Sequence, residues 1–482
     1  MFSRPQTPPN KDPWEDEDFR FKTNGTACEW GEGYHPGGYH PVHLGDTINE
    51  RYRIIRKIGW GQFSTVWLAI DNIQDRYVSL KITLARQGDT SSKEVTLYKS
   101  CIGLRYQQLV SLLDVISITG PNGQHDGLVF ETMGADLNIF LQKRPEFQIG
   151  DPWERRFTKG FAKRALLDII QALNFLHGYG IVHGDIHLGN ILTCIRTPDV
   201  TAESESDLRQ QLSDTRPLKR LDGKGDLWAP SYLLEPQPLH DYFSYELQPL
   251  VKLADLGGGY LLTSSFMAAF EATHPIKGAA AVTPVALRAP ETIFNDHLGR
   301  GIDIWSLGCL IFEMIIGRPL FVGVQSLEGK SYDETSNDEH LIQIWEVIGP
   351  LPKPLLQKWR RADQYFSASG ERLQASGPGE GYDSQDESSQ GHMDSDLGVE
   401  PKSMGEREEQ ASTPRSSEGD IPLTYLGSFD ALEEQFNAEK PSDVEEPEAK
   451  DILHLLRWIF QYDPAQRPTT KDLLQHPWLS RA

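Results

Sequence analysis

The sequence predicts an α+β fold with two lobes, a small strand-rich lobe followed by a large helical lobe. In residues 48–134, short β-branched and aromatic runs are broken by glycines, which is the pattern of strands joined in hairpins. In residues 135–482, apolar residues recur at helical spacing in several long segments. The 482 residues exceed what one simple core usually holds, which agrees with two lobes plus inserts.

Composition and charge narrow the class of protein. The formal net charge of −22 disfavours nucleic acid and acidic membrane surfaces as partners and favours basic ones. The four cysteines are scattered without CxxC spacing, which is typical of a reducing compartment. No apolar run reaches the roughly 18 residues that span a bilayer. We therefore expect a soluble intracellular protein, located in the cytoplasm and the nucleus.

Three segments differ in composition from the lobes. Residues 1–47 are rich in Pro, Gly, His and acidic side chains and predict an irregular lead-in. Residues 196–246 are polar and weakly patterned, and we expect a low-complexity insert there. Residues 366–447 are poor in aromatics and rich in Ser, Gly and acidic residues, which predicts a disordered insert that is dispensable for folding.

The first stretch that suggests chemistry is "GWGQFSTV", between two apolar strands. Gly59 and Gly61 would let the backbone bend closely over a polyphosphate, although glycines in a hairpin more often only form a turn. Lys81 follows on the strand "VSLK", where a lone lysine is usually a solvated edge residue. Glu94, in the next predicted helix, could pair with Lys81 and hold its ammonium on the α- and β-phosphates.

The stretch "VFETMG" predicts the connection between the lobes. Phe130 would close the back of an adenine pocket, and the backbones of Glu131 and Met133 would bond the adenine edge. A plain core strand fits the same residues equally well when they are taken alone.

The stretch "HGDIHLGN" (183–190) has the spacing of a phosphotransfer catalytic loop. The carboxylate of Asp185 would orient the attacking hydroxyl and accept its proton, and Asn190 would offer an oxygen to a metal ion. Asp255 in "LADLGGG" would supply the second metal ligand, a set that suits Mg²⁺. Each of these residues alone would more often be a cap or turn residue. Because these motifs occur together and in the right order along the chain, they predict phosphoryl transfer from ATP with Mg²⁺.

These motifs together resemble the eukaryotic protein-kinase fold, over roughly residues 50–195, 250–365 and 448–480. The later stretches "RAPE", "DIWSLG" and "DPAQRP" carry the same resemblance. It implies that Glu291 pairs with Arg467 and that Asp303 holds the backbone of the catalytic loop. It also implies a set of ATP-binding residues: Ile58, Gly59, Gly61, Val66, Lys81, Glu131 and Met133.

A closer resemblance is to the SR-protein kinase group of the CMGC serine/threonine kinases. It rests on "GGYHPVHLGDTINERYRIIRKIGWGQFSTVWLAID", on "LADLG", and on an insert between Asp185 and Asp255. It implies an enzyme that phosphorylates serines of basic, Arg/Ser-rich proteins such as splicing factors, in mRNA processing. We also expect the protein to be a monomer. The candidate docking patch for such substrates is Asp333, Glu334, Asp338 and Glu339, for which solvated insert charges are an equal alternative.

The catalytic loop departs from the kinase pattern at His187, where the family has a lysine that touches the transferring phosphate. A neutral histidine still donates one hydrogen bond, so we count His187 among the catalytic residues with Asp185, Lys81 and Glu94. Thr283 is the threonine that we expect to bond Asp185. "HGDIHLGN" alone also resembles the loop of aminoglycoside and choline kinases, which work without the lysine. A catalytically weakened kinase-fold scaffold is the other alternative.

Overall fold

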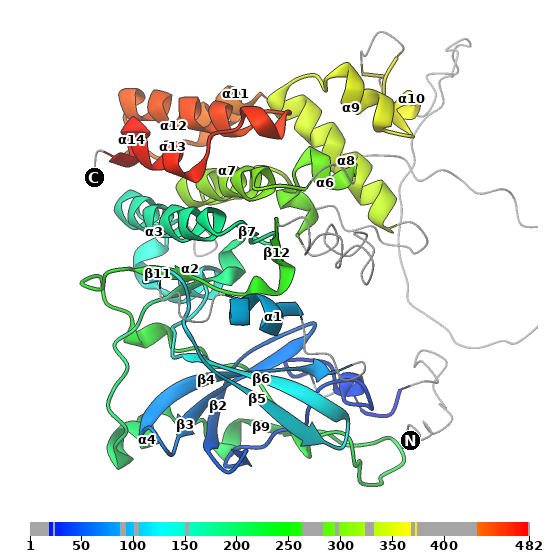
Figure 1. Cartoon of the computed structure of the whole chain (residues 1–482), viewed down its shortest axis with the longest axis vertical. Coiled ribbons are helices and arrows are strands. Elements are labelled where there is room, and N and C mark those ends of the chain that lie inside the picture. Colours follow the sequence, from blue (N-terminus) through cyan, green and yellow to red (C-terminus); the bar gives the residue numbers. More distant parts are fainter. Residues whose placement is uncertain are drawn as a thin grey trace, which may run out of the picture.

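The computed structural model describes residues 19–22, 25–86, 93–100, 106–149, 154–262, 283–294, 298–322, 332–367, 372–373 and 431–480, and it has the two predicted lobes (Figure 1). The small lobe is one antiparallel sheet in the order β1-β2-β3-β4-β6-β5. Its strands are β1 (Thr47–Ile48), β2 (Tyr52–Gly61), β3 (Ser64–Asp71), β4 (Arg76–Ala85), β5 (Leu112–Gly120) and β6 (Gly123–Glu131). The short helix α1 (Lys93–Ser100) lies between this sheet and the large lobe.

The large lobe is built around α7 (Gly301–Ile316), which is apolar on nearly every face and is buried along most of its length. Trp305 and Phe312 of α7 lie in the main core. The helices of this lobe are α2 (Leu137–Lys143), α3 (Lys159–Gly178), α6 (Pro290–Ile293), α7, α8 (Tyr332–Ile348), α9 (Lys353–Lys358), α10 (Ala362–Tyr365), α11 (Leu432–Glu439), α12 (Glu446–Ile459), α13 (Thr470–Gln475) and α14 (Pro477–Ser480). Within the described residues, none of these helices is both long and apolar enough to cross a membrane.

Two short antiparallel strand pairs bring the predicted site segments together. β7 (Ile181–Val182) pairs with β12 (Tyr260–Leu261), and β8 (Ile191–Thr193) pairs with β11 (Val251–Leu253). The stretch 183–190 therefore lies between β7 and β8, and "LADLGGG" lies between β11 and β12. The pairing places the two motifs side by side although a long insert separates them in the sequence.

The described residues of the lead-in, 19–22 and 25–47, pack closely on the small lobe. Arg20 and Tyr34 are fully buried in its described part. Tyr34 donates a hydrogen bond to Glu29 over 2.5 Å, and Glu29 forms a buried ion pair with Lys57 of β2. The lead-in thus anchors the strand that precedes Gly59.

The insert 196–246 is ordered, which corrects the expectation of a low-complexity segment. It contains α4 (Ala202–Leu208), β9 (Thr215–Pro217) and β10 (Tyr232–Leu234). Leu208 and Leu239 are buried against the small lobe. These two leucines are 31 residues apart in the sequence but belong to one apolar cluster, so composition alone did not reveal the packing.

The second insert is shorter than its composition predicts. Residues 368–371 and 374–430 lie outside the described part of the chain, but α11 (Leu432–Glu439) belongs to the core. Phe436 is fully buried and its ring lies 6.3 Å from that of Phe312. The prediction that all of 366–447 lacks core residues is therefore wrong at this end. "LEEQF" places Leu432 and Phe436 on one helix face, a signal that an average over the acidic segment hides.

Replacing Phe436 by alanine should lower the free energy of unfolding by about 3–5 kcal/mol, because it removes a buried aromatic ring and leaves a cavity. Urea denaturation followed by tryptophan fluorescence measures the change. The matched control is Asn437→Ala on the exposed face of the same helix, which should change stability by less than about 0.5 kcal/mol. If the Phe436 variant unfolded at the same urea concentration as the unmodified protein, α11 would not be part of the core.

Candidate active site

Lys81 on β4 is the centre of a charged cluster between the lobes. Its Nζ lies 2.8 Å from Oε1 of Glu94 and 3.1 Å from Oδ2 of Asp255. Burial disfavours the charge on Lys81, but Glu94 and Asp255 together raise its pKa above the ordinary value. Burial likewise opposes the ionised form of Asp255, but Lys81 lowers its pKa. The structure therefore brings together Lys81, Glu94 and Asp255 as the sequence predicts, with Lys81 and Asp255 charged.

Asp185 and Asn190 face each other inside the loop. The side-chain amide of Asn190 donates to the backbone oxygen of Asp185 over 2.9 Å and to its Oδ2 over 3.0 Å. The other carboxylate oxygen, Oδ1, is buried and has no hydrogen-bond partner within the described residues. A buried carboxylate oxygen without a donor is costly unless a ligand supplies one. It suits the hydroxyl of a substrate.

Asp303 holds the backbone of the loop, as the resemblance implies. Its carboxylate accepts hydrogen bonds from the backbone N–H groups of His183 (2.9 Å) and Gly184 (2.8 Å), and its Oδ2 lies 2.8 Å from Nε2 of His177. Burial opposes its ionisation, but the contact with His177 and these bonds lower the pKa of Asp303. The ring of His183 lies 2.9 Å from the backbone oxygen of Ala254, which ties the loop to "LADLGGG".

The backbone conformation at Gly184 requires glycine, and a contact at this residue corrects one expectation. Its φ is 75°, and a Cβ there would lie 2.7 Å from the backbone oxygen of Gly258, so a larger residue would be strained and would clash. Thr283 does not bond the carboxylate of Asp185. Its hydroxyl donates instead to the backbone oxygen of Gly184, the residue that precedes Asp185.

His187 is oriented by its own loop. Its Nδ1 accepts a hydrogen bond from the backbone N–H of Gly189 over 3.0 Å. The neutral ring therefore carries its proton on Nε2, which lies 3.5 Å from Oδ2 of Asp185. The position that holds a lysine in the family thus presents a ring N–H at the carboxylate of Asp185.

A cavity of about 250 Å³ lies between the lobes, beside this cluster. All seven residues that the resemblance implies for ATP binding line it: Ile58, Gly59, Gly61, Val66, Lys81, Glu131 and Met133. Phe130 also lines it, as predicted. Sequence reasoning did not identify the apolar or aromatic lining residues Tyr98, Val110, Leu192 and Ala254, nor Pro238, which comes from the insert.

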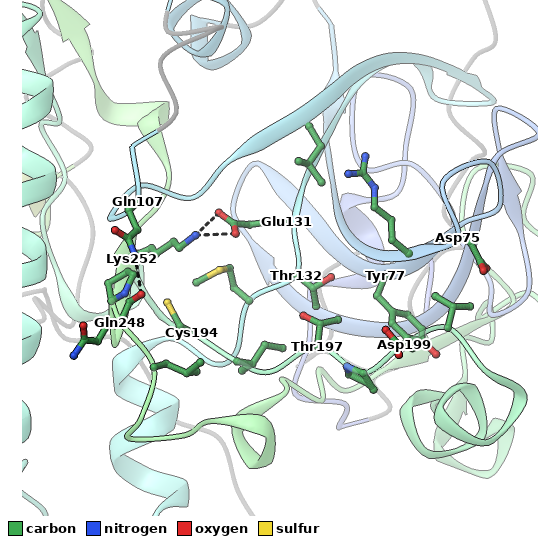
Figure 2. Close-up of a pocket in the computed structure, with 18 residues that line it drawn as sticks. Asp75, Tyr77, Gln107, Glu131, Thr132, Cys194, Thr197, Asp199, Gln248 and Lys252 are labelled. Carbon is green, nitrogen blue, oxygen red and sulfur yellow. Dashed lines mark hydrogen bonds and ion pairs between the residues drawn. The ribbon is translucent and has the colours of Figure 1, made fainter.

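The side chain of Glu131 points away from this cavity. Figure 2 shows it in a second cavity of about 530 Å³ behind the connection between the lobes, facing Lys252. Both carboxylate oxygens lie 2.7 Å from Nζ of Lys252, and one accepts from the backbone N–H of Ser111 over 2.7 Å. On the side of the first cavity Glu131 therefore offers its backbone, as predicted for a residue that bonds adenine.

Glu291 and Arg467 form a buried ion pair with two hydrogen bonds of 2.6 and 2.8 Å. The guanidinium of Arg467 also lies over the ring of Trp305, 5.0 Å from its centroid. The pair joins the start of α6 to the segment before α13, so it fixes the chain just after Thr283 to the large lobe.

The predicted docking patch is corrected at Asp338. This side chain is buried, accepts a hydrogen bond from Nε1 of Trp359 over 2.7 Å and pairs with Arg361 over 2.6 Å. α8 turns it inward, toward the apolar cluster around Trp359, so it is not available to a substrate. Burial and the neighbouring Asp338 raise the pKa of Glu339, which is half-buried. Asp333 and Glu334 lie in α8, but their side chains are outside what the structure describes.

Within the described residues, no group of three or more His, Cys, Asp or Glu side chains is arranged to hold a metal ion. Of the two predicted metal ligands, Asp255 offers a carboxylate and Asn190 an amide oxygen. This donor set fits Mg²⁺, which keeps several waters and takes further ligands from phosphate oxygens, better than a metal that needs a cage of side chains.

Comparisons with known proteins agree with this geometry. The protein kinase domain family matches residues 52–201 and 244–479. The chain is 28% identical to the serine/threonine-protein kinase SRPK of Physarum polycephalum, covering 93% of this chain and 90% of that protein. It is 34% identical to SRSF protein kinase 3 of Homo sapiens, covering 93% and 89%. A crystal structure of a kinase domain superimposes with a TM-score of 0.54 at 18% identity, covering 92% of this chain and 98% of the other.

Proposed function

The chain belongs to the protein kinase family, as an SRPK-like CMGC serine/threonine kinase that uses ATP, and we propose that it phosphorylates serines in basic, Arg/Ser-rich proteins such as splicing factors. The observation that carries the catalytic part is that Oδ1 of Asp185 is buried and has no partner among the residues that the structure describes, in a site that also holds the cluster of Lys81, Glu94 and Asp255. The substrate class is supported by the net charge of −22 and by the name of the human relative, SRSF protein kinase 3.

Each side chain of the site has a distinct task in this proposal. Asp185 orients the serine hydroxyl through Oδ1 and accepts its proton. Lys81, held by Glu94, binds the α- and β-phosphates of ATP. Asn190 and Asp255 would hold Mg²⁺, which when bound neutralises charge on the β- and γ-phosphates. Met133 and the backbone of Glu131 bind the adenine edge.

His187 should contribute to rate without being indispensable. Replacing it by alanine removes the ring N–H beside Asp185 and should lower kcat by about 10- to 100-fold, with KM for ATP changed less than about twofold. His187→Lys supplies a cation at the same place and should restore at least the original kcat. Steady-state kinetics of the three proteins measure both constants. An alanine variant with unchanged kcat would remove His187 from the mechanism.

The substrate class is tested with two peptides that differ only in charge. One consists of Arg-Ser repeats, and in the other alanine replaces every arginine. We expect kcat/KM to be at least about 100-fold higher for the arginine peptide, with phosphate on serine, because a strongly acidic enzyme attracts a basic substrate. Equal kcat/KM values for the two peptides would refute the Arg/Ser preference while leaving the kinase activity intact.

We also propose that the protein acts as a monomer in the cytoplasm and the nucleus. The scattered cysteines without CxxC spacing, which are typical of a reducing compartment, motivate the location. Size-exclusion chromatography with light scattering and imaging of a fluorescent fusion test the two statements.

A further inference from the structure

The ordered insert reaches the nucleotide cavity. Pro238, near the end of the insert, is one of the residues that line the cavity of about 250 Å³ between the lobes, together with Ile58 and Gly59 of β2. It is half-buried there. The other lining residues come from the sheet, from α1, from the connection between the lobes, or from the segments around the catalytic loop.

The insert is held against β2 just before Gly59. Gln210 donates its backbone N–H to the backbone oxygen of Ile55 over 3.0 Å, and its side-chain oxygen accepts from the backbone N–H of Lys57 over 3.0 Å. The backbone N–H of Gln237 donates to the backbone oxygen of Lys57 over 2.9 Å. The insert thereby occupies an edge of β2 that would otherwise expose unpaired backbone groups.

The shape of β2 at this point favours the contact. The register between β2 and β3 shifts between Ile54 and Arg56 and again between Lys57 and Gly59. Such irregularities bend a strand and re-aim its backbone groups. They flank Lys57, the residue whose N–H and carbonyl both bond the insert.

Two further contacts anchor the insert on either side of Pro238. Leu239 is buried in the cluster of Ile55, Leu68 and Leu208, against which Ile58 also packs. Glu205 of α4 forms a two-fold ion pair with Arg53 of β2, with N–O distances of 2.6 and 2.8 Å, and Figure 1 shows α4 beside the small-lobe sheet. Pro238 is thus fixed between Gln237, which is hydrogen-bonded to β2, and Leu239, which is buried.

We infer that Pro238 is a nucleotide-binding residue contributed by the insert, forming part of the outer wall of the cavity beside the adenosine portion of ATP. This inference rests on the proposed use of the cavity for ATP. The residues on either side of Pro238 contact Lys57 and the cluster that includes Ile58, both of which precede the two glycines in β2. Pro238 therefore lies on the adenosine side of the turn formed by Gly59 and Gly61. The ring of proline is rigid, so it contributes apolar surface without losing rotamer freedom.

The test compares Pro238→Ala with Pro236→Ala, a proline in the same segment that is similarly half-buried but does not line the cavity. Isothermal titration calorimetry with ATP and Mg²⁺, and separately with adenosine, measures the Kd of each ligand for each protein. We expect Pro238→Ala to weaken both ligands by the same factor, about threefold to tenfold, because it removes ring carbons from the wall. Pro236→Ala should leave both Kd values within about twofold.

The other outcomes separate the explanations. If Pro238→Ala weakened ATP but not adenosine, the residue would act through the glycine turn and not as a wall of the adenosine site. Unchanged Kd values for both ligands, in a variant that still phosphorylates a peptide, would overturn the inference and leave the proposed function standing. If the unmodified protein bound neither ligand, both the inference and the proposed use of ATP would fall.

Discussion

Replacing Asp185 by asparagine should lower kcat for peptide phosphorylation by about 10²- to 10⁴-fold, the largest effect that we expect from one substitution. Oδ1 of Asp185 is buried and has no donor within the described residues, so it is free to accept the proton of a serine hydroxyl. Asparagine has a similar shape but cannot accept the proton. Steady-state kinetics with a serine peptide and ATP measure the loss.

The affinity for ATP distinguishes lost chemistry from lost structure. Lys81, Glu94 and Asp255 do not depend on Asp185 for their contacts, so the Kd of ATP should change less than about threefold in the variant. Asn190→Ala is a useful companion variant. It removes both the amide that donates to Asp185 and the oxygen that we propose as a metal ligand. An asparagine variant with at least a tenth of the original kcat would exclude Asp185 as the base.

Replacing Arg467 by methionine should lower the free energy of unfolding by about 3–5 kcal/mol, because it leaves the carboxylate of Glu291 buried without its partner. The guanidinium also donates to the backbone oxygens of Gly301 and Gln461, and it stacks over Trp305. Urea denaturation of the purified variant measures the change.

The double variant Glu291→Gln with Arg467→Met is the matched control. It removes the buried charges on both sides, so its loss of stability should be smaller than the sum of the two single losses, by about 1–3 kcal/mol. Strict additivity of the two losses would mean that the pair does not interact in the folded protein. A loss below about 1 kcal/mol for Arg467→Met alone would mean that the pair does not stabilise the large lobe.

Most of the catalytic residues could be predicted from the sequence because each lies in a short motif on its own strand or loop. Asp185 and Asn190 are five residues apart in one loop, and Asp255 follows a strand that pairs with the strand after Asn190. Local spacing therefore carries the information that the fold uses. Glu94 could also be predicted, because it is the single glutamate of α1. Its Oε1 lies 2.8 Å from Nζ of Lys81.

The features that the sequence did not reveal depend on partners far away in the chain. The sequence predicts Asp338 as a surface acid, but its side chain in α8 accepts a hydrogen bond from Trp359. Phe436 stands in an acidic segment, but it packs against Phe312, which is more than a hundred residues earlier. Pro238 lies in a polar insert with no motif, and its place in the nucleotide cavity follows from hydrogen bonds between Gln237 and β2. No local pattern encodes the contacts of Asp338 and Pro238, whereas the signal for Phe436, the "LEEQF" spacing, is hidden by the average over the acidic segment.

The alternative of a small-molecule kinase does not survive the comparisons. The match to the protein kinase domain extends over residues 52–201 and 244–479, which include Glu291, Asp303 and Arg467. These residues are engaged in the contacts described above. The remaining alternative is a scaffold with weakened catalysis. It differs from an active enzyme in one measurable property, the transfer of the γ-phosphate of ATP to serine.

The most direct measurement is therefore the transfer of the γ-phosphate from labelled ATP to a serine peptide of Arg-Ser repeats, with Mg²⁺, by the full chain and by its Asp185→Asn variant. The structure predicts label on peptide serines with the unmodified protein and a loss of at least about 100-fold with the variant. Absence of label on the peptide and on any other protein substrate, or label that is independent of Asp185, would contradict the assignment of this site as the catalytic centre of a protein kinase.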